Sequence, residues 1–358
     1  MNFTLFGYPQ AGKSTLFKVL TGARTSARTF EAGKREAHEH VTPVPDPRLD
    51  RLAGLHPDRK KVAAAVEIID LAGISIGEVK TSVFLNALRR ADLLVHVVRG
   101  FRDERIPHPR RRVAPAEDIR TMDEELVLAD LGTVEARLER LDKDLKKMKN
   151  PDFERERDVL LRGKAHLEGG HPLRTFGFHG DEDKAIRAFA FLSQKAVLHL
   201  VNADESDAGR LDEIERAAGS VGSRASVLAA CGRIEAEIMD VEDPSDKAAF
   251  REEYGLRELT SGRFFKAAMT LLDRVFFYTV GKDEVRAWPI ARSTTALRAA
   301  GSIHTDIEHG FIRAEVVDFE DLAAEGSWHQ AKEKGRVRLE GKDYLVRDGD
   351  VVFFRFAT

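Results

Sequence analysis

Cysteine is nearly absent from this sequence of 358 residues, in which Cys231 stands alone. A single thiol excludes an intramolecular disulfide and is typical of a chain that folds in a reducing compartment. We expect Cys231 to be a small buried residue rather than a reactive nucleophile. No apolar run approaches the ~18 residues of a membrane span, and no signal peptide precedes the first apolar stretch. These absences predict a cytoplasmic protein without membrane contact.

A strong charge of one sign is also missing, because the formal net charge is only −3. The chain as a whole is therefore not drawn to nucleic acid, and any such surface must be a local patch. The sequence is 42% apolar and 33% charged, which is typical of a globular protein. Its length predicts two or three domains, each with its own core.

The first motif lies between an apolar strand at residues 3–6 and a helical pattern that contains Leu16 and Leu20. Gly7, Gly12, Lys13 and Ser14 have the spacing G-x-x-x-x-G-K-[ST] of a phosphate-binding loop. The alternative is a glycine-rich turn that happens to contain a lysine. The strand–loop–helix context favours nucleotide binding, because backbone N–H groups and the helix start then face the phosphates.

Each position of this loop has an expected role. Lys13 would bridge the β- and γ-phosphates, and the Ser14 hydroxyl would bind Mg²⁺. A second acidic motif, Asp70-Leu71-Ala72-Gly73, follows a β-rich run. Asp70 would hold Mg²⁺ through water, and the Gly73 N–H would sense the γ-phosphate. The expected catalytic residues are Lys13, Ser14, Asp70 and Gly73, and the expected nucleotide contacts in the loop are Gly7, Gln10, Ala11, Gly12, Lys13, Ser14 and Thr15.

Three buried runs predict parallel strands at residues 93–98, 196–201 and 226–230, alternating with helices. Such alternation indicates a doubly wound sheet, with ligand groups at the carboxyl ends of its strands. Asn202 and Glu205 follow the second of these strands, and Cys231 and Gly232 follow the third. We expect these four residues to line the nucleotide site.

A charged helical pattern interrupts the sheet at residues 117–149. Its apolar residues are spaced by three and four, as in a coiled-coil seam: Leu131, Val134, Leu138, Leu141, Leu145 and Met148. Asn150-Pro151 ends the pattern, and residues 153–167 offer a partner helix, so we expect an antiparallel hairpin. Its basic tip is either a solvated face or a contact for nucleic-acid phosphates.

The last ~80 residues carry short β patterns at 285–290, 311–317, 344–346 and 351–356, with a helical segment at 293–300. They predict a small β-rich domain. His304, Asp306 and His309 have metal-ligand chemistry, but their spacing favours surface polar residues over a metal site.

These motifs together resemble the YchF-like, or Obg-like ATPase, subfamily of translation-factor-type P-loop NTPases. The resemblance rests on the phosphate loop, VPDPRLD at 44–50, Asp70 to Gly73, LLVHVV with Arg99 after it, and the hairpin start at 124–141. The segments EVRAWPI, AAGSIHTDIEHGFIRAEVV and EGKDYLVRDGDVVFFRF resemble the family's C-terminal TGS domain.

The resemblance implies an α/β fold in which a P-loop NTPase domain has a doubly wound, mostly parallel sheet. That domain would span residues 1–118 and 192–275, interrupted by a helical coiled-coil hairpin at 119–191 and followed by a β-grasp TGS domain at 276–358. It also implies bound ATP or GTP with Mg²⁺, a ribosome or ribosomal RNA as partner, and a monomeric chain.

The resemblance also bears on base preference. Relatives that prefer guanine carry Asn-Lys-x-Asp, whose carboxylate accepts bonds from the guanine N1–H and 2-amino groups. Here Asn202 is followed by Ala203, Asp204 and Glu205, so that acceptor is displaced. ATP is therefore expected over GTP, unless a register slip brings Asp204 into place.

Two departures from the family bear on turnover. Lys34 stands where a switch threonine is expected, and neither Thr29 nor Thr42 has the right spacing. The segment after Ile74 is shortened, and Ile74 itself replaces a water-positioning glutamine, as in the family. We therefore expect slow hydrolysis. The alternatives are a nucleotide-gated binding protein without turnover and an RNA-binding adaptor with a vestigial loop.

Overall fold

The computed structural model describes residues 1–357 except 24–27, 33–34, 74–81, 179 and 220–221, with the backbone alone for 28–32, 35–37 and 82–83. The chain divides into two compact units. Unit 1 comprises residues 1–42 and 67–271, and unit 2 comprises residues 43–66 and 272–358. None of the helices in the described part of the chain is both long and apolar enough to span a bilayer.

Unit 1 is built on a seven-stranded sheet with the order β2-β3-β5-β1-β6-β7-β8. Neighbours from β5 to β8 pair in parallel, and β2 and β3 form an antiparallel pair. The central strands β6 and β7 are buried along almost their whole length, as their apolar runs predict. The strands are β1 (Asn2–Phe6), β2 (Arg28–Ala32), β3 (Arg35–Pro43), β5 (Ala65–Asp70), β6 (Leu93–Gly100), β7 (Ala196–Ala203) and β8 (Ala225–Ala230).

Helices cover both faces of this sheet, which confirms the doubly wound α/β fold. On one face, Phe3 of β1 meets Phe264 of α10 edge-on, with ring centroids 6.1 Å apart. On the other, α3 and α4 pack over Phe6 and Leu94. The helices of this unit are α1 (Lys13–Thr21), α3 (Ser82–Arg90), α4 (Pro115–Leu145), α5 (Pro151–Glu168), α6 (Asp181–Ile186), α7 (Leu211–Ala217), α8 (Gly232–Asp240), α9 (Pro244–Glu253) and α10 (Thr260–Leu271).

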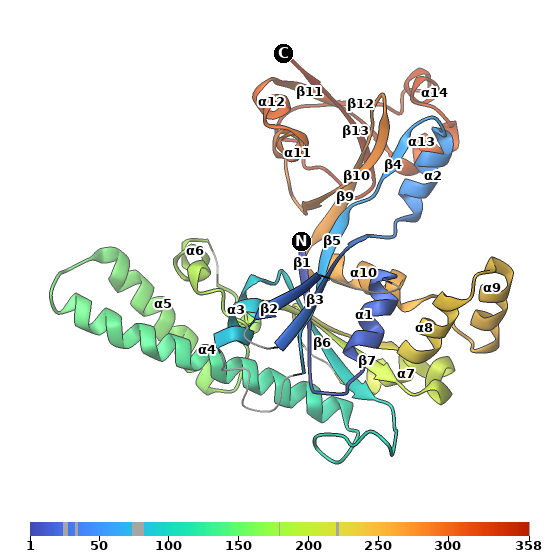
Figure 1. Ribbon diagram of the computed structural model, residues 1–358. Coiled ribbons are helices and arrows are strands. Elements are labelled where there is room, and N and C mark those ends of the chain that lie inside the picture. Colours follow the sequence, from blue (N-terminus) through green and yellow to red (C-terminus); the bar gives the residue numbers. More distant parts are fainter. Residues whose placement is uncertain (24–27, 33–34, 74–81, 179, 220–221, 358) are drawn as a thin grey trace. The chain divides into compact units, whose positions relative to one another are not determined.

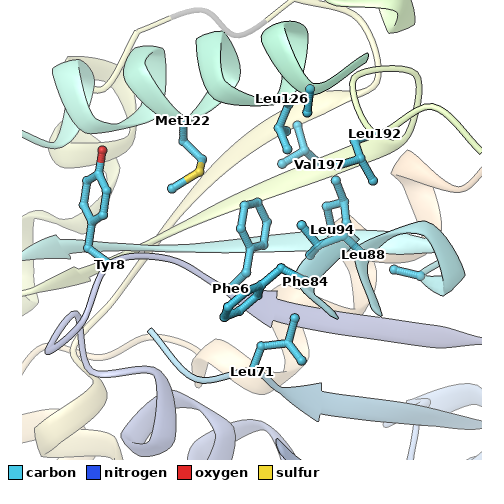
Figure 2. Close-up of a cluster of buried hydrophobic side chains, with 12 residues drawn as sticks. Phe6, Tyr8, Leu71, Phe84, Leu88, Leu94, Met122, Leu126, Leu192 and Val197 are labelled. Atoms are coloured by element: carbon cyan, nitrogen blue, oxygen red, sulfur yellow. The ribbon is translucent and has the colours of Figure 1, made fainter. Parts of the chain in front are cut away.

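Figure 2 shows the buried cluster between α4 and the sheet. Tyr8 follows β1, Leu71 follows β5, and Phe84 belongs to α3. Met122 and Leu126 reach the same cluster from α4. The two loop motifs predicted from the sequence therefore share one core with the base of the hairpin.

The predicted hairpin is formed by α4 and α5, which lie antiparallel (Figure 1). Val134, Leu138 and Leu141 of α4 are buried against Leu160 of α5, as the apolar spacing predicts. Asn150 caps α5 by accepting a hydrogen bond from the Asp152 N–H, with Pro151 as the first helical residue. The seam is shorter than predicted, because α4 ends at Leu145 and Met148 is 61% exposed.

Unit 2 contains a six-stranded sheet with the order β12-β11-β13-β9-β10-β4. One face holds a core with Phe277, Val316 and Phe354 under α11. The elements are α2 (Pro47–Leu55), β4 (Lys60–Val62), β9 (Arg274–Val280), β10 (Glu284–Ala291), α11 (Ala296–Ile303), α12 (Thr305–His309), β11 (Phe311–Asp318), α13 (Phe319–Glu325), α14 (Trp328–Glu333), β12 (Arg338–Glu340) and β13 (Asp350–Phe356).

Unit 2 begins at residue 272, where the predicted C-terminal domain begins at 276, and it also includes an N-terminal segment. Residues 43–66, predicted within 1–118, belong to it, because β4 pairs with β10 and the Asp46 carboxylate accepts from the Tyr278 hydroxyl at 2.5 Å. The predicted strand at 344–346 is wrong, since Leu345 makes only an isolated bridge to Thr295. His304 is exposed and caps α12 by accepting from the Asp306 N–H, so it has a local structural role.

Candidate nucleotide site

The loop between β1 and α1 turns through residues whose backbone torsions favour glycine. Gly7 has φ of 145° and Gly12 has φ of 88°. A Cβ on Gly12 would lie 2.1 Å from the Asn202 Nδ2, and one on Gly7 would lie 2.3 Å from the Val97 carbonyl oxygen. Both positions therefore require glycine for conformation and for space.

Lys13 begins α1 and lies folded back over the loop. Its Nζ donates to the carbonyl oxygens of Tyr8 at 3.0 Å and Gly7 at 3.4 Å. The side chain is 8% exposed, and burial lowers the pKa of its ammonium group while nearby Asp70 opposes that shift. The arrangement holds one positive charge at the mouth of the loop, where phosphate oxygens can replace carbonyl oxygens as acceptors.

Ser14 and Asp70 come together although 55 residues separate them in the sequence. The parallel pairing of β1 with β5 places the end of β5 beside the loop, and the Ser14 Oγ donates to the Asp70 Oδ2 at 3.0 Å. Asp70 is 4% exposed, and its Oδ1 has no hydrogen-bond partner among the described residues. Burial raises the pKa of Asp70, while the Ser14 hydroxyl and the Lys13 charge act to lower it.

This pair of oxygen donors fits Mg²⁺. The hydroxyl and the carboxylate are hard ligands, and the unpartnered Asp70 Oδ1 is free to accept from a metal-bound water. No group of three or more His, Cys, Asp or Glu side chains suited to a metal occurs in the described part of the chain. Mg²⁺ does not need one, since it takes one or two protein ligands together with phosphates and water.

Gly73 touches the phosphate loop directly. A Cβ at this position would lie 2.6 Å from the Pro9 Cα. The backbone of the Asp70–Gly73 motif and that of the loop are therefore in close contact, which only glycine permits. Ile74 and Lys34 lie outside the described residues, and Thr42 is buried on β3.

Asn202 occupies a bridging position at the end of β7. Its Nδ2 donates to the Ala11 carbonyl oxygen at 3.2 Å, and its Oδ1 accepts from the Gly232 N–H at 3.1 Å. The side chain thus connects the phosphate loop to the loop that starts α8. Its expected role in lining the nucleotide site stays a prediction, because both ends of the amide already have backbone partners.

The other residues predicted to line the nucleotide site lie in different environments. The Glu205 carboxylate forms an ion pair with Arg233 at 2.9 Å. Cys231 is 1% exposed, its Sγ donates to the Asp204 carbonyl oxygen, and burial raises the pKa of its thiol to about 12. Cys231 is therefore an inert buried residue, as expected. In the loop, Gln10 is exposed with φ of 61°, Ala11 is buried and Thr15 is half-buried.

Several residues beside the loop were not singled out from the sequence as site residues. The Arg99 guanidinium donates to the carbonyl oxygens of Phe101 and Ile106 and lies 4.5 Å from the Phe101 ring centroid. That ring approaches Gly12. The Tyr8 ring packs edge-on against His108, which faces Asp118 at 3.3 Å. Only the position of Arg99 at the end of a buried strand could have indicated this arrangement.

Comparisons with known proteins agree with this geometry. Residues 2–155 match the family model described as "50S ribosome-binding GTPase". Residues 275–357 match the model of the C-terminal domain of YchF-type GTPases, described as "Protein of unknown function (DUF933)".

The similar proteins cover nearly the whole chain. It is 39% identical to the "Ribosome-binding ATPase YchF" of Bacillus subtilis over 98% of both chains. It is 34% identical to "Obg-like ATPase 1" of Oryza sativa over 98% of this chain and 91% of that one. The solved Schizosaccharomyces pombe YchF GTPase superposes with a TM-score of 0.84 at 25% identity, covering 99% of this chain and 97% of that one. The chain therefore belongs to the YchF family of Obg-like P-loop NTPases.

Proposed function

We propose that this protein hydrolyses ATP slowly, with Mg²⁺, and associates with ribosomes. The observation that carries the hydrolytic part is the convergence of Lys13, Ser14 and Asp70 at the carboxyl ends of β1 and β5. Mg²⁺, when bound, would supply charge neutralisation on the β- and γ-phosphate oxygens. Ser14 and Asp70 would hold it.

The residues of the chain contribute mainly electrostatic stabilisation. The Lys13 ammonium exchanges its two backbone acceptors for phosphate oxygens, and the loop N–H groups donate to the same phosphates. The Gly73 backbone lies against Pro9 of the phosphate loop, and its N–H would sense the γ-phosphate. Water would attack the γ-phosphorus in line with the leaving oxygen. We propose slow turnover because Ile74 has no group that can orient this water.

The environment of Asp204 supports a preference for ATP. Its Oδ1 accepts from the Ser206 N–H at 3.2 Å and hydroxyl at 3.0 Å, and its Oδ2 accepts from the Arg102 N–H at 3.4 Å. Glu205 is paired with Arg233. Both carboxylates are thus engaged elsewhere, whereas guanine recognition needs one that accepts from N1–H and the 2-amino group. A competition titration should show ATP displacing GTP; a tenfold preference for GTP, about 1.4 kcal/mol, would overturn the proposal.

Single-turnover hydrolysis tests the enzyme proposal. Lys13→Ala should lower the rate by at least about 100-fold, since it removes a charge that acts on the transition state. Lys18→Ala is the matched control, because Lys18 lies on the same helix but pairs with Asp240 at 2.7 Å. A rate that Lys13→Ala leaves unchanged would instead favour a nucleotide-gated binding protein. Failure to bind nucleotide at all would favour an adaptor with a vestigial loop.

Association with ribosomes is proposed from the similarity to proteins named as ribosome-binding ATPases and from the hairpin tip. Lys146, Lys147 and Lys149 are exposed there, beyond the end of α4. Cosedimentation with ribosomes should weaken when all three become glutamine, with a shallower dependence on salt. The same three positions changed to arginine keep the charge and should keep binding. If both triple variants cosediment like the parent chain, the hairpin tip is not the contact.

A further inference from the structure

Unit 1 has a groove beside the middle of α4. The groove has a volume of about 490 Å³ and is walled by Leu85 of α3, by α4 from Leu128 to Arg140, and by Phe189 of the 3₁₀ turn Arg187–Phe189. The lining residues of α4 recur at every turn, so the groove follows the axis of this helix. Between residues 128 and 140 it extends for about 18 Å, or roughly three helical turns.

The floor of this groove is apolar and open. Leu128 is 46% exposed. Gly132 and Ala136 follow it at intervals of four residues, and both are exposed as well. A Cβ on Gly132 would meet nothing within 4 Å, so there is free space directly above the α4 backbone. Small residues between larger aliphatic ones allow a second helix to approach closely and to lay its own apolar face into the groove.

The charges along the groove are positive. Its lining includes Arg137 and Arg140 and, among the described residues, no acidic side chain. The Arg137 Nε donates to the Glu156 carboxylate at 2.7 Å, whereas Arg140 is exposed and forms no ion pair within the described part of the chain. Arg89 of α3 adds a charge beside Thr133, to whose Oγ1 its Nη2 donates at 3.1 Å. An apolar groove with arginines along its edge is complementary to an apolar helix face that carboxylates flank.

Nucleic acid fits this groove less well than a helix does. Unstacked bases bind to exposed aromatic faces. Phe189 is the aromatic ring of the groove's described lining, and it is already stacked on Phe191, with ring centroids 5.2 Å apart. The other apolar lining residues are leucine and alanine, which pack against aliphatic side chains.

We propose that the groove binds a helical segment of a partner protein, with apolar residues on Leu85, Leu128 and Ala136 and acidic residues beside Arg89 and Arg140. The groove is lined by none of the residues expected to bind nucleotide and by none of the lysines at the hairpin tip. It is therefore a surface that nucleotide hydrolysis and the proposed ribosome contact do not use.

Two designed peptides test this proposal on the full-length protein. Each is a fluorescein-labelled helix of about 14 residues with leucine along one face, flanked by glutamate in one peptide and by lysine in the other. Fluorescence anisotropy measures both dissociation constants. We expect the glutamate peptide to bind with a dissociation constant below about 100 μM, and the lysine peptide to bind at least about tenfold more weakly. Salt should weaken the binding of the glutamate peptide.

Charge reversal at one position distinguishes the groove from general attraction. Arg140→Glu should weaken the glutamate peptide about tenfold and strengthen the lysine peptide by a similar factor. Arg120→Glu is the matched control, because Arg120 is exposed on the same helix, lies 3.8 Å from Glu124 and does not line the groove. It should change either constant by less than about twofold. Leu128→Gln removes apolar contact from the floor and should weaken the glutamate peptide about tenfold. Circular dichroism checks that each variant is folded.

Three results would overturn the proposal. One is the absence of binding by either peptide up to about 1 mM. Another is an equal effect of Arg140→Glu and Arg120→Glu, which would indicate diffuse charge attraction rather than a site. The third is a different occupant. Self-association that Leu128→Gln abolishes, measured by sedimentation velocity, would assign the groove to a second copy of the chain, and displacement of the glutamate peptide by single-stranded RNA would assign it to nucleic acid.

Discussion

His96 and His199 form a buried pair at the centre of the parallel sheet of unit 1. Their Nδ1 atoms lie 3.0 Å apart, so one ring donates to the other, and neither side chain is exposed. Neither Nε2 has a partner among the described residues. Burial lowers the pKa of His199 to about 3, and burial together with the neighbouring ring lowers the pKa of His96 well below its usual range. The folded protein therefore keeps both rings neutral.

This pair predicts that unit 1 loses stability in mild acid. Below pH ~6.5 the unfolded chain takes up protons on both rings and the folded chain does not, so the free energy of unfolding falls by about 1.4 kcal/mol per pH unit for each histidine. The loss begins near pH 6.5 and continues toward pH 3. Urea unfolding between pH 7.5 and 4.5 measures it.

A double variant separates this effect from acid titration elsewhere. His96→Leu with His199→Leu removes both polar partners together and fills a similar volume, so it leaves no unpaired group. Its free energy of unfolding should depend less steeply on pH in that window. The same slope in the variant and the parent chain would show that the two rings take up protons equally in the folded and unfolded states, and would contradict the prediction.

At the scale of the secondary-structure elements, Asp130 connects the α4–α5 hairpin to the sheet. It lies on α4, is 1% exposed, and accepts hydrogen bonds from the Leu192 N–H at 2.9 Å and the Ser193 N–H at 2.7 Å. Leu192 and Ser193 lie in the segment that leads from the hairpin into β7. Burial raises the pKa of this carboxyl to about 6, while the two N–H groups partly offset the shift.

Asp130→Ala should therefore destabilise unit 1 by about 3 kcal/mol, because it leaves two buried N–H groups unpaired. Chemical denaturation measures the loss, and limited proteolysis near residue 192 should become faster. Gly132→Ala is a control on the same helix: Gly132 is exposed, and a Cβ there would meet nothing within 4 Å. That change should stabilise by about 0.5–1 kcal/mol. Equal effects of the two changes would contradict the anchoring role.

Some helices and strands could be predicted from the sequence, and others could not. The strands β6, β7 and β8 were predicted because buried parallel strands are apolar throughout. The helix α2 was not predicted, although Asp46 as N-cap and Pro47 as first residue are a helix-start signature. The strand β4 has only three residues, of which two are exposed, and its pairing with β10 depends on a contact more than 200 residues away.

The candidate site likewise contains features that the sequence predicts and contacts that it does not. Lys13 and the glycines follow from local spacing, and the meeting of Ser14 with Asp70 follows from strand order. The bridge that Asn202 makes from the phosphate loop to the start of α8 does not, since it requires the register of β6, β7 and β8 to be known. Local chemistry was predictable, whereas the partner of each side chain was set by tertiary packing.

At the scale of the whole molecule, the chain crosses between the two units three times, near residues 42, 66 and 271. Each unit has its own buried core: Phe6 and Leu94 belong to that of unit 1, and Phe277 and Phe354 to that of unit 2. The residues expected to bind nucleotide all belong to unit 1. Both tryptophans, Trp288 and Trp328, belong to unit 2.

This division predicts that nucleotide stabilises only one of two unfolding transitions. A ligand at 100 times its dissociation constant adds about 2.7 kcal/mol to the folded state, which raises the melting temperature of a domain of this size by roughly 5–10 °C. Calorimetry with Mg-ATP should show that shift in one transition, while the melting curve from tryptophan emission, which reports unit 2, should not move. Lys13→Ala should abolish the calorimetric shift and leave the emission curve unchanged. If nucleotide instead raised both curves together, the two units would unfold as one cooperative body, and the separate cores would not act as independent units of stability.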